Sequence, residues 1–129
     1  MTIGHVALWV QDLERMKTFY ERYFGAQANA NYVNARKQFQ SYFLTFAAGP
    51  RLELMQRPDI LPLERQPGQE FLGYAHLAMN VGSATAVDEL TQRLVTDGYQ
   101  RLDGPRWTGD GYYESVILDP EGNRLEITM

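Results

Sequence analysis

The two histidines of this chain, which has no others, occupy matching places in an internal repeat. His5 lies in the string GHVALWV, and His76 lies 71 residues later in the string AHLAMNV. Glu53 in RLEL and Glu126 in RLEI repeat in the same way, 73 residues apart. Neutral imidazoles and carboxylates together are ligands for a divalent metal ion. The two repeats therefore predict a metal site formed by these two histidines and two glutamates.

The alternation of residue types indicates that the four side chains share a face of the protein. Successive side chains of a β-strand point to opposite faces of the sheet. In the first copy His5 shares a face with Ala7 and Trp9, and in the second His76 shares one with Ala78. The two glutamates alternate with aliphatic residues. All four candidates therefore lie on the face opposite the apolar face that a helix must cover. The small alanines provide space beside them.

Apolar spacing predicts the same order of elements in both copies, strand, helix and then further strands, which is an α+β fold. Strands are expected at residues 3–10, 39–46, 51–56, 75–81, 112–118 and 124–128, and a loop or weak strand at residues 27–37. A helix follows each of the N-caps Asp12 and Ser83, and the helices end at Gly25 and Gly98. Residues 1–57 are expected to form the first module, residues 58–73 a proline-containing linker, and residues 74–129 the second module.

Composition limits the class of protein. The 129 residues are 44% hydrophobic and 22% charged, with a net charge of −4, which is typical of a soluble single domain. The chain has no cluster of basic residues, so nucleic-acid binding is not expected, and no apolar run is long enough to span a membrane. The absence of cysteine excludes disulfides and thiolate ligands. The first residues lack the pattern of a signal peptide, so we expect a cytoplasmic protein that acts on a small molecule.

The strings that carry the histidines, with FYERYFG at residues 19–25 and LDPEGNRLEI at residues 118–127, resemble the vicinal oxygen chelate superfamily. This is the glyoxalase, bleomycin-resistance and extradiol-dioxygenase group, and the resemblance covers nearly the whole chain. It implies two βαβββ modules paired into a curved mixed sheet around a metal-binding cup, and a homodimer. The order His5, Glu53, His76, Glu126 is similar to the four-ligand pattern of bacterial glyoxalase I, or lactoylglutathione lyase.

Two positions depart from the glyoxalase I pattern. In that enzyme, an Arg four residues after the first ligand and an Asn four residues after the second bind glutathione. The corresponding positions here are Trp9 and Arg57. The departures speak against a glutathione thioester as the substrate.

The chemistry expected at such a site is proton transfer at a carbon next to a carbonyl group. A bound Zn²⁺, Ni²⁺, Co²⁺ or Mn²⁺ acts as a Lewis acid and stabilises the developing enediolate. Glu126 is the expected catalytic base, with Glu53 as the near-symmetric alternative. The residues expected to line the substrate cup are Trp9, Phe43, Asn80 and Tyr113.

Two other functions stay open. If Glu53 is not a ligand, the remaining two histidines and Glu126 suit Fe(II) and O₂, as in an extradiol-type dioxygenase. A protein that binds a drug or metabolite without turnover is the other alternative, although such relatives usually lack the metal residues. The modules are expected to pair either within one chain or across the two-fold axis of a homodimer.

Overall fold

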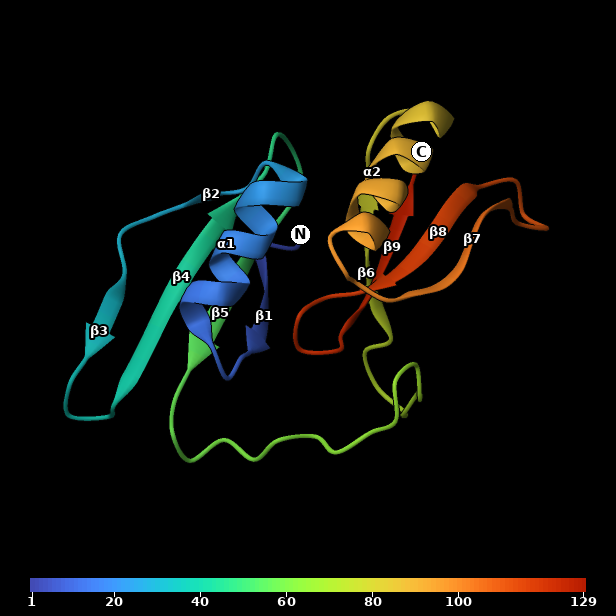
Figure 1. Ribbon diagram of the computed structural model, residues 1–129. Helices are drawn as coiled ribbons and strands as arrows, with labels where there is room; N and C mark the ends of the chain where they lie inside the picture. The colour runs from blue at the N-terminus through green and yellow to red at the C-terminus, as the bar shows by residue number, and fades with distance from the viewer. The chain divides into compact units, whose positions relative to one another are not determined.

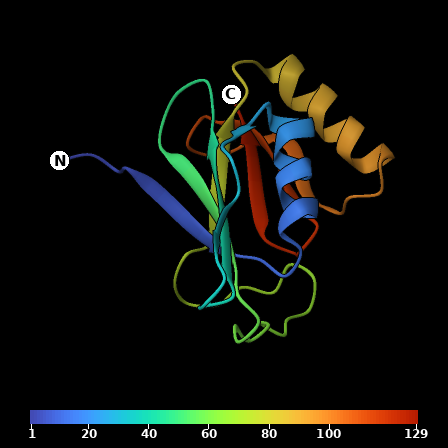
Figure 2. The same cartoon turned by 90° about the vertical axis from the view of Figure 1, so that its left-hand side faces the viewer.

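The structure is a computed structural model that describes all 129 residues, and the chain divides into two compact units, Met1–Glu64 and Arg65–Met129 (Figure 1). Each unit consists of one mixed sheet with one helix along one of its faces (Figure 2). The expected α+β class is therefore confirmed, as two mixed sheets and two helices. The pairing of the two modules around a metal ion stays a prediction.

Unit 1 contains helix α1 (Leu13–Phe24) and a five-stranded sheet in the order β1-β5-β4-β2, with β3 also paired to β4. The strands are β1 (His5–Trp9), β2 (Gln27–Ala28), β3 (Tyr32–Asn34), β4 (Phe39–Thr45) and β5 (Arg51–Gln56). β1 runs parallel to β5, and β4 is antiparallel to its neighbours. The stretch expected to be loop or weak strand thus contains the two short strands β2 and β3.

Helix α1 forms where the sequence supplies both a cap and an apolar stripe. The Asp12 side chain accepts a hydrogen bond from the backbone N–H of Arg15 at 3.0 Å, and Gly25 ends the helix at φ 65°. The buried residues of the helix are Leu13, Met16, Phe19, Tyr20 and Tyr23. They cover the sheet face that carries Leu44, Leu52 and Leu54. The opposite face of the sheet is left for His5 and Glu53.

Unit 2 repeats this architecture with helix α2 (Ala84–Thr96) and a sheet in the order β6-β9-β8-β7. The strands are β6 (His76–Asn80), β7 (Arg101–Trp107), β8 (Tyr113–Leu118) and β9 (Arg124–Thr128). β6 is parallel to β9, as β1 is to β5 in unit 1. In the core, the buried hydroxyls of Thr91 and Ser115 lie 2.6 Å apart and join α2 to β8.

Strand β7 was not among the strands expected from apolar spacing, although the βαβββ module implied by the resemblance has a strand at this place. It contains Gly104 and Pro105, which normally interrupt strands, and its pairing with β8 is irregular at two places. Gly104 has φ 73°, and a Cβ atom there would collide with the backbone oxygen of Glu114 and the Cα of Ser115. Glycine therefore allows β7 to approach β8 closely enough to pair at the sheet edge.

Within unit 2, the residues that precede β6 form hydrogen bonds and an ion pair with the end of the chain. The Arg65 guanidinium donates to the carbonyl of Gly122 at 2.6 Å and to the side-chain oxygen of Asn123 at 3.1 Å. Arg124 donates to the carbonyl of Gly68 at 3.2 Å and lies 3.6 Å from the Glu70 carboxylate. Residues 65–70 are thus held against the turn between β8 and β9 and against β9 itself.

Candidate metal-binding residues: two histidine–glutamate pairs

The first pair lies on the open face of the unit 1 sheet. The Nε2 atom of His5 is 3.6 Å from an Oε atom of Glu53, and the two side chains are 44% and 14% exposed. Ala7 lies directly across from Glu53 in the parallel β1–β5 pair, two residues beyond His5. The small alanine leaves the carboxylate accessible between neighbouring side chains. Strand alternation and register therefore bring together a histidine and a glutamate 48 residues apart.

The second pair has the same geometry in unit 2. The Nε2 atom of His76 is 3.1 Å from an Oε atom of Glu126, with the side chains 38% and 21% exposed. Ala78 lies across from Glu126 in the parallel β6–β9 pair. The register of the two units is thus identical around the candidate ligands. All four expected ligands lie where the alternation predicts, away from the helix-covered faces.

The donor atoms of each pair suit a divalent cation. Two ligand atoms about 2.1 Å from one ion are about 3.0–3.4 Å apart at octahedral or tetrahedral angles. The observed separations of 3.1 and 3.6 Å are close to this range. Within the structure no three His, Asp or Glu side chains form a metal-binding group. Each unit by itself therefore presents two candidate ligands, one histidine and one glutamate.

Aromatic rings and guanidinium groups surround the pair in unit 1. The His5 ring contacts the edge of Phe43 at a centroid distance of 5.3 Å, and the Arg51 guanidinium lies 4.3 Å above the Phe43 ring. Trp9 contacts Phe39 at 6.1 Å, and a second guanidinium lies over its indole ring at 5.2 Å. That guanidinium belongs to Arg57, which is also paired with the Asp59 carboxylate at 2.5 Å.

A second carboxylate shares the face that carries the pair in unit 2. Glu114 lies across from Thr128 in the β8–β9 pair and shares the face that carries Glu126. Burial raises the pKa of the Glu114 carboxyl above its ordinary value, and the charge of Glu126 raises it further. Glu114 was not among the residues expected at the site, although strict alternation in β8 places it opposite the helix-facing Ser115. The alternation of residues in β8 contains this information, but only the register of β8 with β9 shows that Glu114 shares a face with Glu126.

Three of the four expected cup residues share the candidate face, and one does not. Trp9 and Asn80 occupy equivalent positions two residues after the alanines, and Phe43 lies across from Glu53. Tyr113 instead points to the helix side, where its hydroxyl donates to the Asp88 carboxylate of α2 at 2.8 Å. Tyr113 was expected on the face that carries Glu126, and this was wrong. Its neighbour Glu114, one position along the strand, occupies that face instead.

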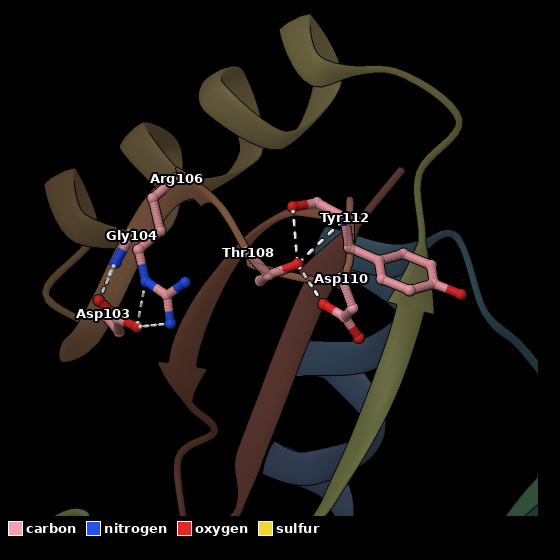
Figure 3. Close-up of polar contacts among 6 residues, drawn as sticks. All are labelled: Asp103, Gly104, Arg106, Thr108, Asp110 and Tyr112. Carbon is pink, nitrogen blue, oxygen red and sulfur yellow. Dashed lines mark hydrogen bonds and ion pairs between the residues drawn. The ribbon is translucent and has the colours of Figure 1, made fainter.

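The turn between β7 and β8 is held by a compact set of hydrogen bonds (Figure 3). The Thr108 hydroxyl donates to the Asp110 carboxylate at 2.6 Å and accepts from the backbone N–H of Tyr112 at 2.9 Å. Nearby, the Arg106 guanidinium and the Asp103 carboxylate form an ion pair at 2.7 Å, which lowers the pKa of Asp103 (Figure 3). This turn is therefore an ordered hairpin of unit 2.

Comparison with known proteins agrees with this architecture. The model of the Glyoxalase/Bleomycin resistance protein/Dioxygenase superfamily matches residues 2–127. The chain belongs to this superfamily. The uncharacterized protein YwkD of Bacillus subtilis (strain 168) is 32% identical over 130 residues, which cover 98% of this chain and 94% of that protein.

Solved structures of the superfamily share the fold. A glyoxalase family protein from Enterococcus faecalis is 23% identical, with a TM-score of 0.77 over 98% of this chain and 96% of that one. The trypanothione-dependent glyoxalase I of Leishmania major is 19% identical, with a TM-score of 0.77 over 99% of this chain and 86% of that one. The superfamily includes many enzymes that use divalent metals on small molecules. No helix in this structure is long and apolar enough to cross a membrane.

Proposed function

We propose that this protein is a divalent-metal enzyme of glyoxalase type, which moves a proton between carbons next to a chelated carbonyl group. The observation that carries the proposal is the equivalence of the two pairs. His5–Glu53 and His76–Glu126 occupy the same register positions in two sheets, although residues farther along that face, such as Trp9 and Asn80, differ. Four donors of the right types, two from each unit, make up one complete ligand set.

The ion when bound supplies Lewis acidity, which stabilises negative charge on a substrate carbonyl oxygen. The two histidines bind as neutral imidazoles and fix the position of the site, since each begins an edge strand, β1 or β6, that is paired with the strand carrying its glutamate. The two glutamates bring negative charge and, in addition, the capacity to accept a proton. Zn²⁺, Ni²⁺, Co²⁺ and Mn²⁺ all suit a set of two nitrogen and two oxygen donors.

We assign the role of catalytic base to Glu126. Its carboxylate is within 3.1 Å of His76, is partly exposed, and therefore has access to a substrate carbon. It takes a proton from one carbon and returns it to the neighbouring one. Glu53 is the alternative base, because its position in unit 1 is equivalent. The Glu126→Gln and Glu53→Gln variants, assayed with retained metal, distinguish the two.

Metal content tests the proposal first. Mass spectrometry of the tag-free protein should find about one divalent ion per chain, and the His5→Ala variant should lose it. Glu89→Gln, a change at an exposed position of α2, is the matched control and should keep the ion. A wild-type protein without stoichiometric metal after reconstitution with each of the four metals contradicts the proposal and favours a non-catalytic binding protein.

The Fe(II) alternative and the four-ligand proposal differ at Glu53. With four ligands, Glu53→Gln weakens metal binding strongly, as removal of any ligand does. With a 2-His-1-carboxylate site of His5, His76 and Glu126, the same variant keeps its metal and takes up oxygen with a catechol.

Mixing two inactive variants shows whether the ligands come from one chain or from two. His5→Ala and His76→Ala chains are unfolded together, refolded together and assayed for metal. If each site combines unit 1 of one chain with unit 2 of its partner, mixed dimers regain one intact site. If both units of a site come from one chain, the mixture holds no more metal than the separate variants.

A further inference from the structure

The two repeats carry equivalent histidine–glutamate pairs but very different flanking residues. By strand register, Trp9 of unit 1 corresponds to Asn80 of unit 2, and Phe43 corresponds to Val116. Tyr32 in turn corresponds to Arg106, since each pairs with the equivalent residue of the next strand. The aromatic residues of unit 1 are therefore not required by the fold, because unit 2 forms the same sheet without them.

The aromatic side chains of unit 1 form a continuous strip on the candidate face. Trp9 contacts Phe39 at 6.1 Å, and Phe39 contacts Tyr32 at 6.1 Å. Trp9 is 39% exposed and Tyr32 is 55% exposed, so the rings are open to solvent. A folded protein gains little from rings left in water, which favours a role in binding. Such a strip favours flat aromatic ligands, because a pair of aromatic rings gains more free energy than the burial of its apolar area alone provides.

A cation without an anionic partner lies at the other end of the same face. The Arg51 guanidinium stacks on Phe43 at 4.3 Å and forms no ion pair. Its counterpart in unit 2, Arg124, is engaged by Gly68 and Glu70. Arg51 lies directly across from His5 in the β1–β5 register. The face therefore offers positive charge beside the histidine and aromatic surface beyond the glutamate.

We propose that this face of unit 1 is the subsite for an aromatic carboxylate, so that the substrate is a small aromatic acid. The proposal rests on the proposed function, since it names the substrate class of that site. The carboxylate lies at the Arg51 guanidinium, and the ring packs against Trp9 beside Phe39. The Arg51 guanidinium lies over Phe43, which is across from Glu53, and Trp9 is about 7 Å farther along the strand direction from that level. One ring separated from the carboxylate by a short chain spans this distance.

Binding of simple probes tests the subsite without any turnover. The affinity for 3-phenylpropionate is measured by saturation-transfer NMR titration, next to 3-cyclohexylpropionate and 3-phenylpropanol, which lack the flat ring and the charge. We expect 3-phenylpropionate to bind at least fivefold more tightly than either. Trp9→Leu should weaken it about five- to tenfold, and Arg51→Gln should remove its advantage over the alcohol.

Trp107→Leu is the matched control, because Trp107 is the other tryptophan, is also exposed, and lies in unit 2 away from the histidine pair. It should bind 3-phenylpropionate within twofold of the wild type. Equal affinities for the three probes, or equal losses in the two tryptophan variants, overturn the proposal. A change of oligomeric state in Trp9→Leu without loss of probe binding also overturns it, and assigns the strip to a contact between copies.

The titrations are run on both chelator-treated and metal-loaded protein, so that the two proposals fail separately. Selective binding of 3-phenylpropionate by a protein that never holds metal keeps the subsite and removes the metal enzyme. Stoichiometric metal without selectivity among the probes keeps the metal site and removes the aromatic subsite.

Discussion

Ala7 lies directly across from Glu53 in the β1–β5 pair, two residues from His5 on one side and two from Trp9 on the other. The methyl group is the only side chain of β1 between the histidine and the indole on that face, and it is exposed to solvent. The access of any ligand to Glu53 therefore depends on the small size of residue 7.

Replacement of Ala7 by leucine should block the site without unfolding unit 1. The larger side chain occupies the space over Glu53, while the helix-covered face is unchanged. We expect metal content and probe binding to fall at least tenfold and the urea midpoint to stay within experimental error. Ala30→Leu, in the exposed segment between β2 and β3, is the control. Normal metal content in Ala7→Leu would show that Glu53 is not a ligand in the proposed orientation.

The buried hydroxyl pair in unit 2 should contribute measurably to stability. Thr91→Val removes the donor to the Val87 carbonyl and leaves the Ser115 hydroxyl without its partner at a fully buried position. A loss of about 1–3 kcal/mol in the free energy of unfolding is expected from urea titration. Addition of Ser115→Ala to this variant should recover part of the loss, because the orphaned hydroxyl is then gone. This account would be contradicted if the double variant lost more free energy of unfolding than the two single variants together.

Gly104 should not tolerate a side chain. The Cβ of Gly104→Ala collides with the backbone of Glu114 and Ser115, and φ 73° is itself unfavourable for alanine. We expect a loss of about 1–3 kcal/mol in the free energy of unfolding, which thermal or urea denaturation measures. Gly109→Ala is the matched control in the same hairpin, because nothing lies within 4 Å of its Cβ position and its φ is not in the left-handed region. Equal effects of the two changes would refute the role of close strand approach.

The link between Tyr42 and α1 predicts a pH dependence. The Tyr42 hydroxyl donates to the Glu14 carboxylate at 2.5 Å, and this bond raises the pKa of Tyr42 above its ordinary value of 10.0, as does burial. A raised pKa means that the stability from this bond is fully present below pH 10 and is lost as the pH rises through the pKa of the folded state. Tyr42→Phe should therefore cost about 0.5–1.5 kcal/mol at pH 8.

The stability difference between wild type and Tyr42→Phe should shrink above pH 10, when the hydroxyl ionises. Urea titrations of both proteins at pH 8 and above pH 10 measure it. A difference that stays constant over this range would show that the hydroxyl packs without bonding to Glu14.

Most of the framework could be predicted because local signals and the repeat agree. Asp12 and Ser83 cap the helices as expected, and the alternation around His5 and His76 placed both histidines opposite the core. Each of these features depends on a few neighbouring residues. The repeat then showed that each local pattern occurs twice, which made the candidate ligands stand out from single exposed residues.

The errors arose where the outcome depends on contacts between strands. Gly104 and Pro105 usually interrupt strands and so conceal β7 in the sequence, and the close approach of β8 that requires a glycine at position 104 is a contact between strands. Tyr113 and Glu114 are adjacent, and only the pairing of β8 with β9 shows which of them shares a face with Glu126. A strand shifted by one residue exchanges its two faces, so sequence pattern alone does not settle such positions.

The correspondence of Trp9 with Asn80 also bears on how such a protein acquires new substrates. In an assembly of identical single modules, every substitution beside one half of the ligand set appears beside the other half as well. Two modules joined in one chain are free of this constraint, because each copy mutates independently. One copy can then gain aromatic residues on this face while the other does not, and the ligands need not change. With two joined copies, the residues that contact the substrate can therefore change while the residues that carry out the reaction stay the same.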